Sequence, residues 1–201
     1  MYEYRKLTAK EREEILLCRQ KQGYPLHAPP HPAKGEGRFL ITAANFEHKH
    51  TMYSHLRRTE FELLALDVLK NASINPIGWI VMPNHYHLLI HTGSFGKIPQ
   101  VFKHLYGKTS REWNRIDNKP GRKVWFKYSD RKIRSERHFY CALNYIHYNP
   151  VKHGYAQSAE DWPWSSIHLY VQDHGIEWIQ SKWESFPILD FGKGWDDQSD
   201  D

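Results

Sequence analysis

Short apolar runs along the chain predict its strands. One strand is expected at residues 38–43 and another at residues 123–128. Between them, residues 76–92 read PIGWIVMPNHYHLLIHT, in which Pro83 and Asn84 separate two apolar runs. Because proline followed by asparagine suits the central positions of a tight turn, this stretch predicts a β-hairpin.

Apolar residues spaced by three and four positions predict the helices. This spacing covers residues 60–69 and 98–116. The capping box TAKE predicts an earlier helix over residues 9–21, which a Pro- and Gly-rich arm follows. Another helix is expected to begin after Ser135 and to end at Pro150, because proline disfavours helical geometry in the residue before it.

The order strand, helix, hairpin, helix, strand, helix predicts an α+β fold with a mainly antiparallel sheet flanked by helices. We expect three regions. An N-terminal helix and Pro-rich arm occupy residues 1–35, one α+β domain occupies residues 36–170, and a helical extension with an acidic tail occupies residues 171–201.

Positive charge is concentrated in one segment. The whole chain carries a formal net charge of +5, but residues 97–137 hold thirteen Lys and Arg against four acids, a net charge of +9. Such a segment is typical of a surface that binds phosphates, although a solvated basic face without a ligand has the same composition. The side chains we predict to bind phosphate groups are His104, Lys108, Arg111, Arg115, Arg122, Lys123, Lys127, Arg131, Lys132 and Arg134.

Neither a membrane span nor a disulfide is expected. The longest apolar run, around residues 77–82, is far shorter than a transmembrane helix. Cys18 and Cys141 share no metal-binding or redox spacing, which indicates reduced thiols and a cytoplasmic location.

Two histidines flank one aromatic residue in the second strand of the predicted hairpin. Side chains alternate between the two faces of a strand, so His85 and His87 point the same way, roughly 7 Å apart along the strand, and Tyr86 points the other way. Two such imidazoles can converge on one cation. The alternative is that both are ordinary polar residues with hydrogen-bond partners.

Tyr145 and Asn149 lie four residues apart on the last predicted core helix and therefore share a face. The Asn149 carboxamide can reach a cation from the last turn. Equally, the tyrosine can be a core-edge residue and the asparagine a simple cap. The pattern does not separate Tyr145 from Tyr140 and Tyr148.

The motifs MPNHYHLLI, YIHYNPVKHG and WPWSS, in this order, resemble the single-strand tyrosine transposases of the HUH superfamily, and within them the REP-associated group. The resemblance covers roughly residues 37–170. It implies a ferredoxin-like core in which His85, His87 and Asn149 bind a divalent metal ion, Mg²⁺ or Mn²⁺. It also implies that Tyr145 is the nucleophile. The aromatic Tyr86 departs from the smaller residues common there, and the arm before residue 35 has no counterpart that we recognise.

The resemblance implies a metal-dependent endonuclease and strand transferase that cuts single-stranded DNA near palindromic hairpins through a 5′-phosphotyrosine. His138 and His147 are candidates for the base that takes the phenol proton. A monomer associated with the nucleoid through DNA is favoured, with a homodimer as the alternative. Two other functions stay open: a domesticated protein that binds hairpin DNA without cutting it, and a metal-dependent nuclease that uses water as its nucleophile.

Overall fold

A computed structural model describes residues 35–192 continuously. It also describes five earlier positions, Thr8, Lys10, Glu13, Glu14 and Leu17. The chain divides into two units, residues 1–34 and residues 35–201. The expected helix over residues 9–21 and the arm after it therefore lie outside the described residues, apart from the last four of those positions, as does the acidic end after residue 192.

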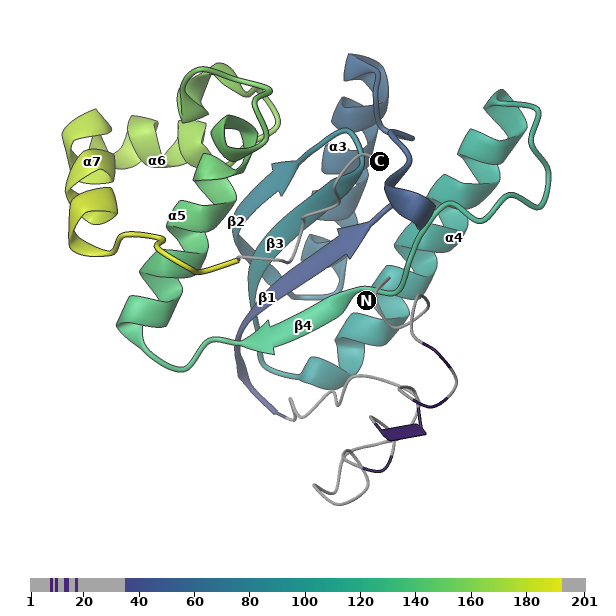
Figure 1. Cartoon of the computed structure of the whole chain (residues 1–201), viewed down its shortest axis with the longest axis horizontal. Helices are drawn as coiled ribbons and strands as arrows, with labels where there is room; N and C mark the ends of the chain where they lie inside the picture. The colour runs from purple at the N-terminus through teal and green to yellow at the C-terminus, as the bar shows by residue number, and fades with distance from the viewer. Residues whose placement is uncertain (1–7, 9, 11–12, 15–16, 18–34, 193–201) are drawn as a thin grey trace. The chain divides into compact units, whose positions relative to one another are not determined.

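Four antiparallel strands form one sheet in the order β2-β3-β1-β4 (Figure 1). Their bounds are β1 (Gly37–Ala44), β2 (Asn75–Val81), β3 (His85–Thr92) and β4 (Ser129–Lys132). Strand β3 pairs along its whole length with β1 on one side and, from Tyr86 to His91, with β2 on the other. The predicted α+β class and the predicted hairpin are therefore confirmed.

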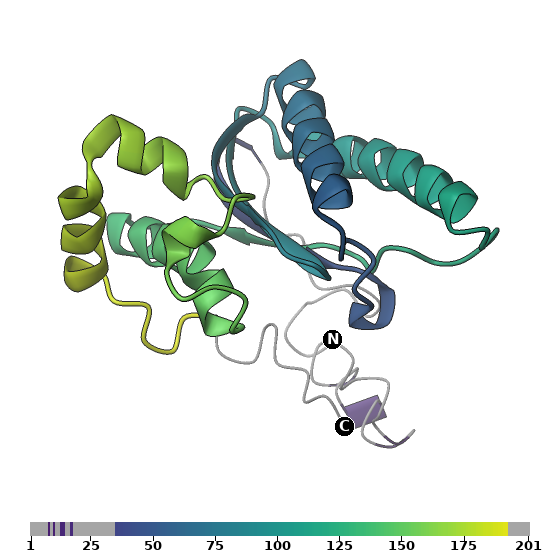
Figure 2. The ribbon, with the colours of Figure 1, turned by 90° about the horizontal axis from the view of Figure 1, so that it is seen from above.

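Helices cover both faces of this sheet. Helices α3 (His55–Asn71) and α4 (Ile98–Ile116) pack on one face, and α5 (Glu136–Lys152) packs on the other. Helices α6 (Ile167–His174) and α7 (Ile176–Ser185) lie on the α5 side, as the view along the sheet shows (Figure 2). None of the described helices combines the length and apolar character that a membrane span requires.

Between residues 35 and 192 the structure also has three short 3-10 turns: η1 (Phe46–His48), η2 (Phe95–Lys97) and η3 (Ala159–Asp161). The predicted helix over residues 98–116 matches α4, and its neighbour α3 starts five residues earlier than expected. The α3 start is capped by Ser54, whose side-chain oxygen accepts a hydrogen bond from the Arg57 amide at 3.2 Å.

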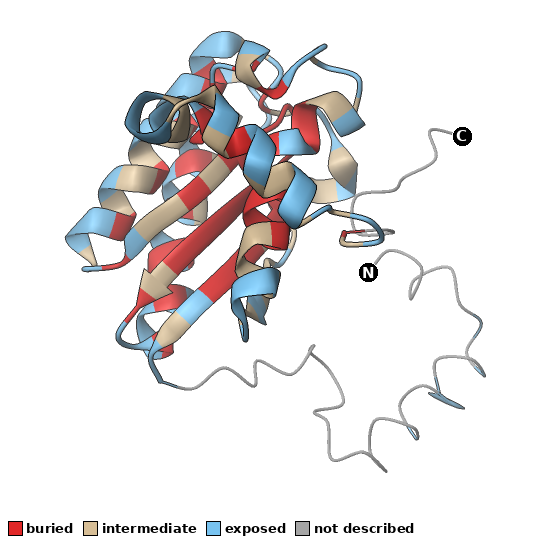
Figure 3. Cartoon of the chain, turned by 90° about the vertical axis from the view of Figure 1, so that its left-hand side faces the viewer, coloured by how far each residue is buried: buried red, intermediate tan, exposed pale blue. Residues whose placement is uncertain are grey.

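The central strands are buried on both faces (Figure 3). Tyr86 faces α3 and α4, where its ring lies 4.9 Å from that of Phe61 and 6.4 Å from that of Phe102. Its neighbours in the strand, His85 and His87, face α5 instead. This is the alternation of faces predicted from the sequence.

The predicted strand at residues 123–128 is wrong, because β4 lies at Ser129–Lys132. Val124 and Trp125 are buried, but they serve as core packing before the ladder begins. The Trp125 indole N–H donates to the Thr109 hydroxyl of α4 at 2.8 Å. An apolar run thus filled the core without forming a strand.

The expected end of α5 at Pro150 is also wrong, because the helix continues to Lys152. Proline lacks an N–H and cannot donate a helical hydrogen bond. Its carbonyl nevertheless accepts from the Tyr155 amide at 2.8 Å, and both Pro150 and the preceding Asn149 are buried. Tertiary packing therefore overrides the local preference of the chain.

Candidate active site

The hairpin and the last core helix bring the two predicted histidines and Asn149 together. His85 and His87 are almost fully buried between β3 and α5, with ring centroids 5.2 Å apart. The Asn149 side chain lies between them. Its Oδ1 is 2.9 Å from His85 Nε2, and its Nδ2 is 3.3 Å from His87 Nε2.

The outer ring nitrogens of both histidines contact oxygen atoms. His85 Nδ1 lies 2.7 Å from Asn84 Oδ1, and His87 Nδ1 lies 2.8 Å from the Thr42 hydroxyl of β1. An amide oxygen can only accept, so Nδ1 of His85 carries the proton and Nε2 presents its lone pair to Asn149. The Asn149 amide donates to His87 Nε2, which assigns the proton of His87 to Nδ1 in the same way.

In this orientation of the Asn149 carboxamide, one contact pairs two acceptors. With the proton of His85 on Nδ1, its Nε2 and the Asn149 Oδ1 are two acceptors 2.9 Å apart. Two acceptors at this distance repel each other unless positive charge lies between them. A half-turn of the Asn149 carboxamide, which exchanges Oδ1 and Nδ2, removes this conflict by donating to His85 Nε2; in the orientation described, a second proton on His85 or a metal cation supplies the charge.

Tyr145 lies one helical turn before Asn149 on the same face of α5. Its ring centroid is 5.1 Å from that of His87, and the ammonium group of Lys152 is 5.2 Å from the centre of its ring. Tyr140 instead stacks on Phe186, and the neighbouring Tyr148 is 42% exposed. The structure therefore separates three tyrosines that the sequence pattern left equivalent.

The chain after α7 returns across α5 and covers Tyr145. The Phe191 ring lies 5.7 Å from the Tyr145 ring, and Gly192 is buried with a φ of +80°. A Cβ atom at Gly192 would overlap the Tyr145 ring. Only 1% of Tyr145 is exposed in consequence.

Neither candidate base lies beside the phenol. His147 sits on another side of α5, where Nε2 is 2.9 Å from the Ser166 hydroxyl; burial, with a smaller contribution from the charge of His168, lowers its pKa to about 3. His138 lies two turns before Tyr145, or about 10 Å along the helix. Burial, and then the charges of Arg131 and Arg134, lower the pKa of His138.

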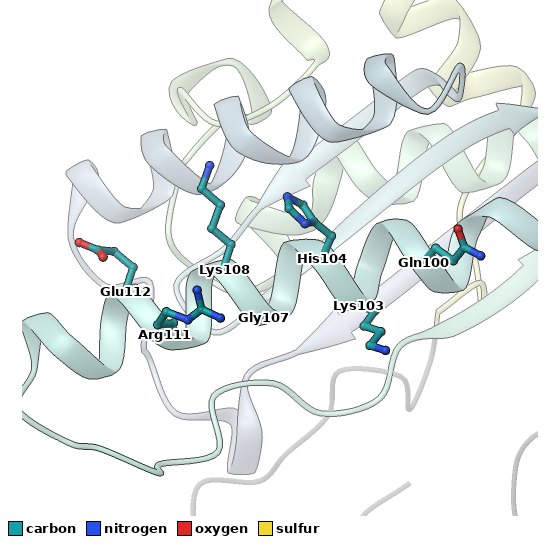
Figure 4. A pocket seen from close by; sticks show the side chains of 7 residues that line it. All are labelled: Gln100, Lys103, His104, Gly107, Lys108, Arg111 and Glu112. Carbon is teal, nitrogen blue, oxygen red and sulfur yellow. The ribbon is translucent and has the colours of Figure 1, made fainter.

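The predicted DNA-binding side chains do not form one surface with this site. His104, Lys108 and Arg111 line a hollow of about 740 Å³ on α4, which packs on the opposite face of the sheet from Tyr145 (Figure 4). Further along α4, Arg115 is exposed and pairs with Glu112 at 2.6 Å. Arg122 is half-buried, and its guanidinium group contacts the side chains of Asp117 and Asn114.

The remaining predicted basic residues lie on or next to β4. Arg131 pairs with Leu40 in the sheet and so points to the α5 face, the face of the histidine pair. Lys132 donates to the Glu36 carbonyl at 3.1 Å, and the ammonium group of Lys123 lies 4.4 Å from the centre of the Phe46 ring. The other two, Lys127 and Arg134, are exposed.

Sequence reasoning missed several residues at the site. Thr42 and Asn84 hold the histidines, but their role depends on strand pairing and turn geometry that no local motif encodes. It also missed Lys49, His50 and Lys119, which gather with Arg122 in a second basic hollow. These residues come from separate segments, so the only local signal was their charge.

Comparison with known proteins places the chain among relatives. No family model matches the sequence. The Haemophilus influenzae protein named "Putative REP-associated tyrosine transposase" is 30% identical over 111 residues, which span 47% of this chain and 63% of that protein. The Escherichia coli REP-associated tyrosine transposase is 24% identical over 155 residues, which span 70% of this chain and 82% of that protein.

The sequence of this chain is similar to those of REP-associated tyrosine transposases. The resemblance seen in its motifs is thereby confirmed, although the chain spans just under two thirds of the Haemophilus relative. A solved structure of the REP-associated tyrosine transposase bound to a REP hairpin has a TM-score of 0.56 and 20% identity, and the match covers 70% of this chain and 81% of that chain. The fold is therefore that of the REP-associated tyrosine transposases.

Proposed function

We propose that this protein is a tyrosine transposase that cuts and rejoins single-stranded DNA near palindromic hairpins. The proposal assigns the nucleophile to Tyr145 and the binding of a divalent metal ion to His85, His87 and Asn149. The observation that carries it is the 5.1 Å separation between the rings of Tyr145 and His87, with Asn149 one helical turn from the phenol. Names and folds of the relatives support the same reaction class.

The donor set fits Mg²⁺ or Mn²⁺. Neighbouring ligands of an octahedral ion with bonds of about 2.1 Å lie about 3.0 Å apart, and His85 Nε2 lies 2.9 Å from Asn149 Oδ1. Among the described residues, no group of three or more His, Cys, Asp or Glu side chains could hold a metal, so this site depends on the amide. A set without a carboxylate should bind the ion weakly until phosphate oxygens join it.

The proposed reaction exchanges one phosphate ester bond for another. The Tyr145 oxygen forms a bond to phosphorus while the bond from phosphorus to the 3′ oxygen breaks; the phenol loses a proton and the leaving 3′ oxygen gains one. A bound divalent ion would neutralise charge on a nonbridging phosphate oxygen. The phosphotyrosine retains the energy of the broken ester, so a 3′-hydroxyl can reverse the step without ATP.

Two features around Tyr145 bear on this attack: the positive charge of Lys152 and the C-terminal chain that covers the phenol ring. A phenol ordinarily has a pKa of about 10 and must lose its proton, and the ammonium group of Lys152 places positive charge beside the ring. Because Phe191 and Gly192 cover the ring and Tyr145 is only 1% exposed, DNA can reach the Tyr145 oxygen only after these two residues have moved.

The partner we propose is a palindromic hairpin with an adjoining single strand. The relative of known structure is described as bound to a REP hairpin. Tyr145 and the histidine pair meet within a single chain, which supports a monomer that needs no tyrosine from a second copy. We propose that the monomer acts on DNA in the cytoplasm.

Replacing Tyr145 by Phe tests the proposal. Labelled hairpin-bearing single strands incubated with Mn²⁺ should yield a slow-migrating covalent species on a denaturing gel with the natural protein and none with the variant. DNA binding should be unchanged, since only one hydroxyl is lost. Tyr148→Phe, a matched change at an exposed position of the same helix, should retain the adduct.

The same gel separates the other two functions. Binding without any metal-dependent cleavage, across varied hairpins, would support a domesticated hairpin-binding protein, which is the alternative that the burial of Tyr145 favours over cleavage by this residue. Cleavage that persists in the Tyr145→Phe protein with no protein-linked product would indicate water as the nucleophile.

A further inference from the structure

A second basic hollow lies where α3 begins and α4 ends. It has a volume of about 560 Å³ and is formed by the loop before α3, the first turn of α3 and the chain after α4. We name it the Arg57 pocket. The side chains of interest in its lining are Lys49, His50, Tyr53, Arg57, Lys119 and Arg122.

Positive charge dominates the Arg57 pocket. Four Lys and Arg side chains line it against a single acid, Asp117. The hydrogen bond from Arg57, and a weaker one from Arg122, lower the pKa of the Asp117 carboxyl, so this acid stays ionised while it is shared between two guanidinium groups. With His50 neutral, the net charge of the lining is +3.

Two of these cations are held in place before any ligand arrives. Arg57 is buried to 93%, donates to the Thr51 carbonyl at 3.0 Å and to Asp117, and lies 5.5 Å from the ring of Trp113. Arg122 Nε donates to Asn114 Oδ1 at 2.9 Å. A guanidinium group that is already ordered loses little conformational entropy when it binds an anion.

The Arg57 pocket holds more basic residues than are needed to link α3 to α4. The contact of Arg57 with Asp117 is sufficient for that link. Lys119 and Lys49, both exposed, bring two more cations to the same hollow, where Lys49 also pairs with Glu47 at 2.8 Å. Exposed like charges that gather in one place repel each other, and an anionic ligand removes this cost.

The Arg57 pocket adjoins the candidate active site through shared backbone contacts. The loop that forms one wall donates from the Asn45 amide to the Asn84 carbonyl at 2.7 Å and from the Met52 amide to the Pro83 carbonyl at 2.8 Å. Asn84 is the residue that contacts His85 Nδ1. One loop therefore supports both the pocket and the turn that presents the histidines.

We infer that the Arg57 pocket binds a backbone phosphate of the DNA strand that the active site cuts. Guanidinium groups match the geometry of phosphate oxygens, and the lysines add charge without sequence preference. The inference rests on the proposed function for the identity of the strand. The chemistry of the pocket, a phosphate among fixed cations, also admits free phosphate as a ligand, and the experiment distinguishes the two.

The test is the double variant Lys49→Gln, Lys119→Gln, which removes two exposed charges and leaves the Arg57 network intact. Binding of a labelled single strand is measured by fluorescence anisotropy in EDTA over a range of salt concentrations, so that cleavage plays no part. Each phosphate contact on a single strand contributes about 0.7 to the slope of log K against log salt. We therefore expect the slope to fall by about 1.4 and the affinity at low salt to fall about tenfold.

A matched control is Lys70→Gln, Lys97→Gln. Lys70 lies on α3 thirteen residues beyond Arg57, or about 20 Å along the helix, and Lys97 donates to the Ala72 carbonyl at that same end. This variant changes the total charge equally and should keep at least most of the affinity and the slope. Equal losses in both variants, or no loss in the first, would overturn the inference.

Inorganic phosphate distinguishes the ligand source. If millimolar phosphate competes with the strand in the natural protein as strongly as a second unlabelled strand does, the Arg57 pocket is a site for free phosphate. The proposed nuclease function is read separately, from covalent adducts in Mn²⁺. Absence of adducts would reject Tyr145 as nucleophile and leave the binding result of the pocket intact.

Discussion

Strand β3 presents two faces of opposite character to the helices around it. On the α3 and α4 side, Tyr86 is buried among the aromatic rings of Phe61, Phe102 and Trp125. On the α5 side, the residues before and after it are histidines buried against an amide and a phenol. Burial without apolar partners costs stability. The comparison indicates that one layer stabilises the fold and that the other uses this stability to hold a polar site.

The largest effect on stability should come from a substitution on the apolar face of β3. Tyr86→Ala should lower the free energy of unfolding by about 3–5 kcal/mol, because it leaves a large cavity and deprives the Tyr106 hydroxyl of its 2.6 Å partner. Chemical denaturation measures the change. Tyr53→Ala, at a position 69% exposed, is the control and should alter stability little. A small loss for Tyr86→Ala would show that the stabilising core lies elsewhere.

A threonine-to-valine substitution on each side of the sheet tests the difference between the two layers. Thr109→Val leaves the buried Trp125 indole N–H without its acceptor and should cost about 1–3 kcal/mol of stability. Thr42→Val removes the oxygen that orients His87 and should weaken Mn²⁺ binding about 10- to 100-fold, measured by titration calorimetry. If Thr42→Val left Mn²⁺ affinity unchanged, the histidine pair would not be a metal site oriented by β1.

The smallest effect concerns a buried histidine that plays no part in the site. The folded pKa of His147, about 3, lies below its ordinary value of 6.5, so the unfolded chain binds the proton first. The stability from keeping it neutral is complete above pH 6.5 and is lost as pH falls, by up to about 1.4 kcal/mol per pH unit. Denaturation between pH 7 and pH 5 should show this slope, and His147→Gln should reduce it. An unaltered slope would assign it to other groups.

The parts of the fold with strong local signals were predictable from sequence. The periodicity of α4 and the Pro83–Asn84 turn of the hairpin are local, and both elements appear where expected. Strand β4, at residues 129–132, has the polar sequence SDRK and gives no strand signal. It forms because β1 offers a free edge. The apolar residues before it, chiefly Trp125, were needed in the core instead.

The candidate active site was also predictable from the sequence only in part. Alternation along a strand was enough to place His85 and His87 together on one face. It could not choose Tyr145 among the tyrosines of α5, since several sit near the edge of the apolar stripe and only docking decides which one meets the histidines. The contact of Gly192 with Tyr145 joins positions 47 residues apart in sequence, and no local sequence pattern predicts it.

The central claim is that the Tyr145 oxygen forms the covalent link to DNA. The direct measurement is mass spectrometry of protease-digested adducts made by the natural protein with a hairpin-bearing strand in Mn²⁺. The account predicts that the peptide containing Tyr145 carries the 5′-phosphoryl nucleotide and that EDTA abolishes the modification. A nucleotide attached at Tyr140, Tyr148 or any other residue would contradict it.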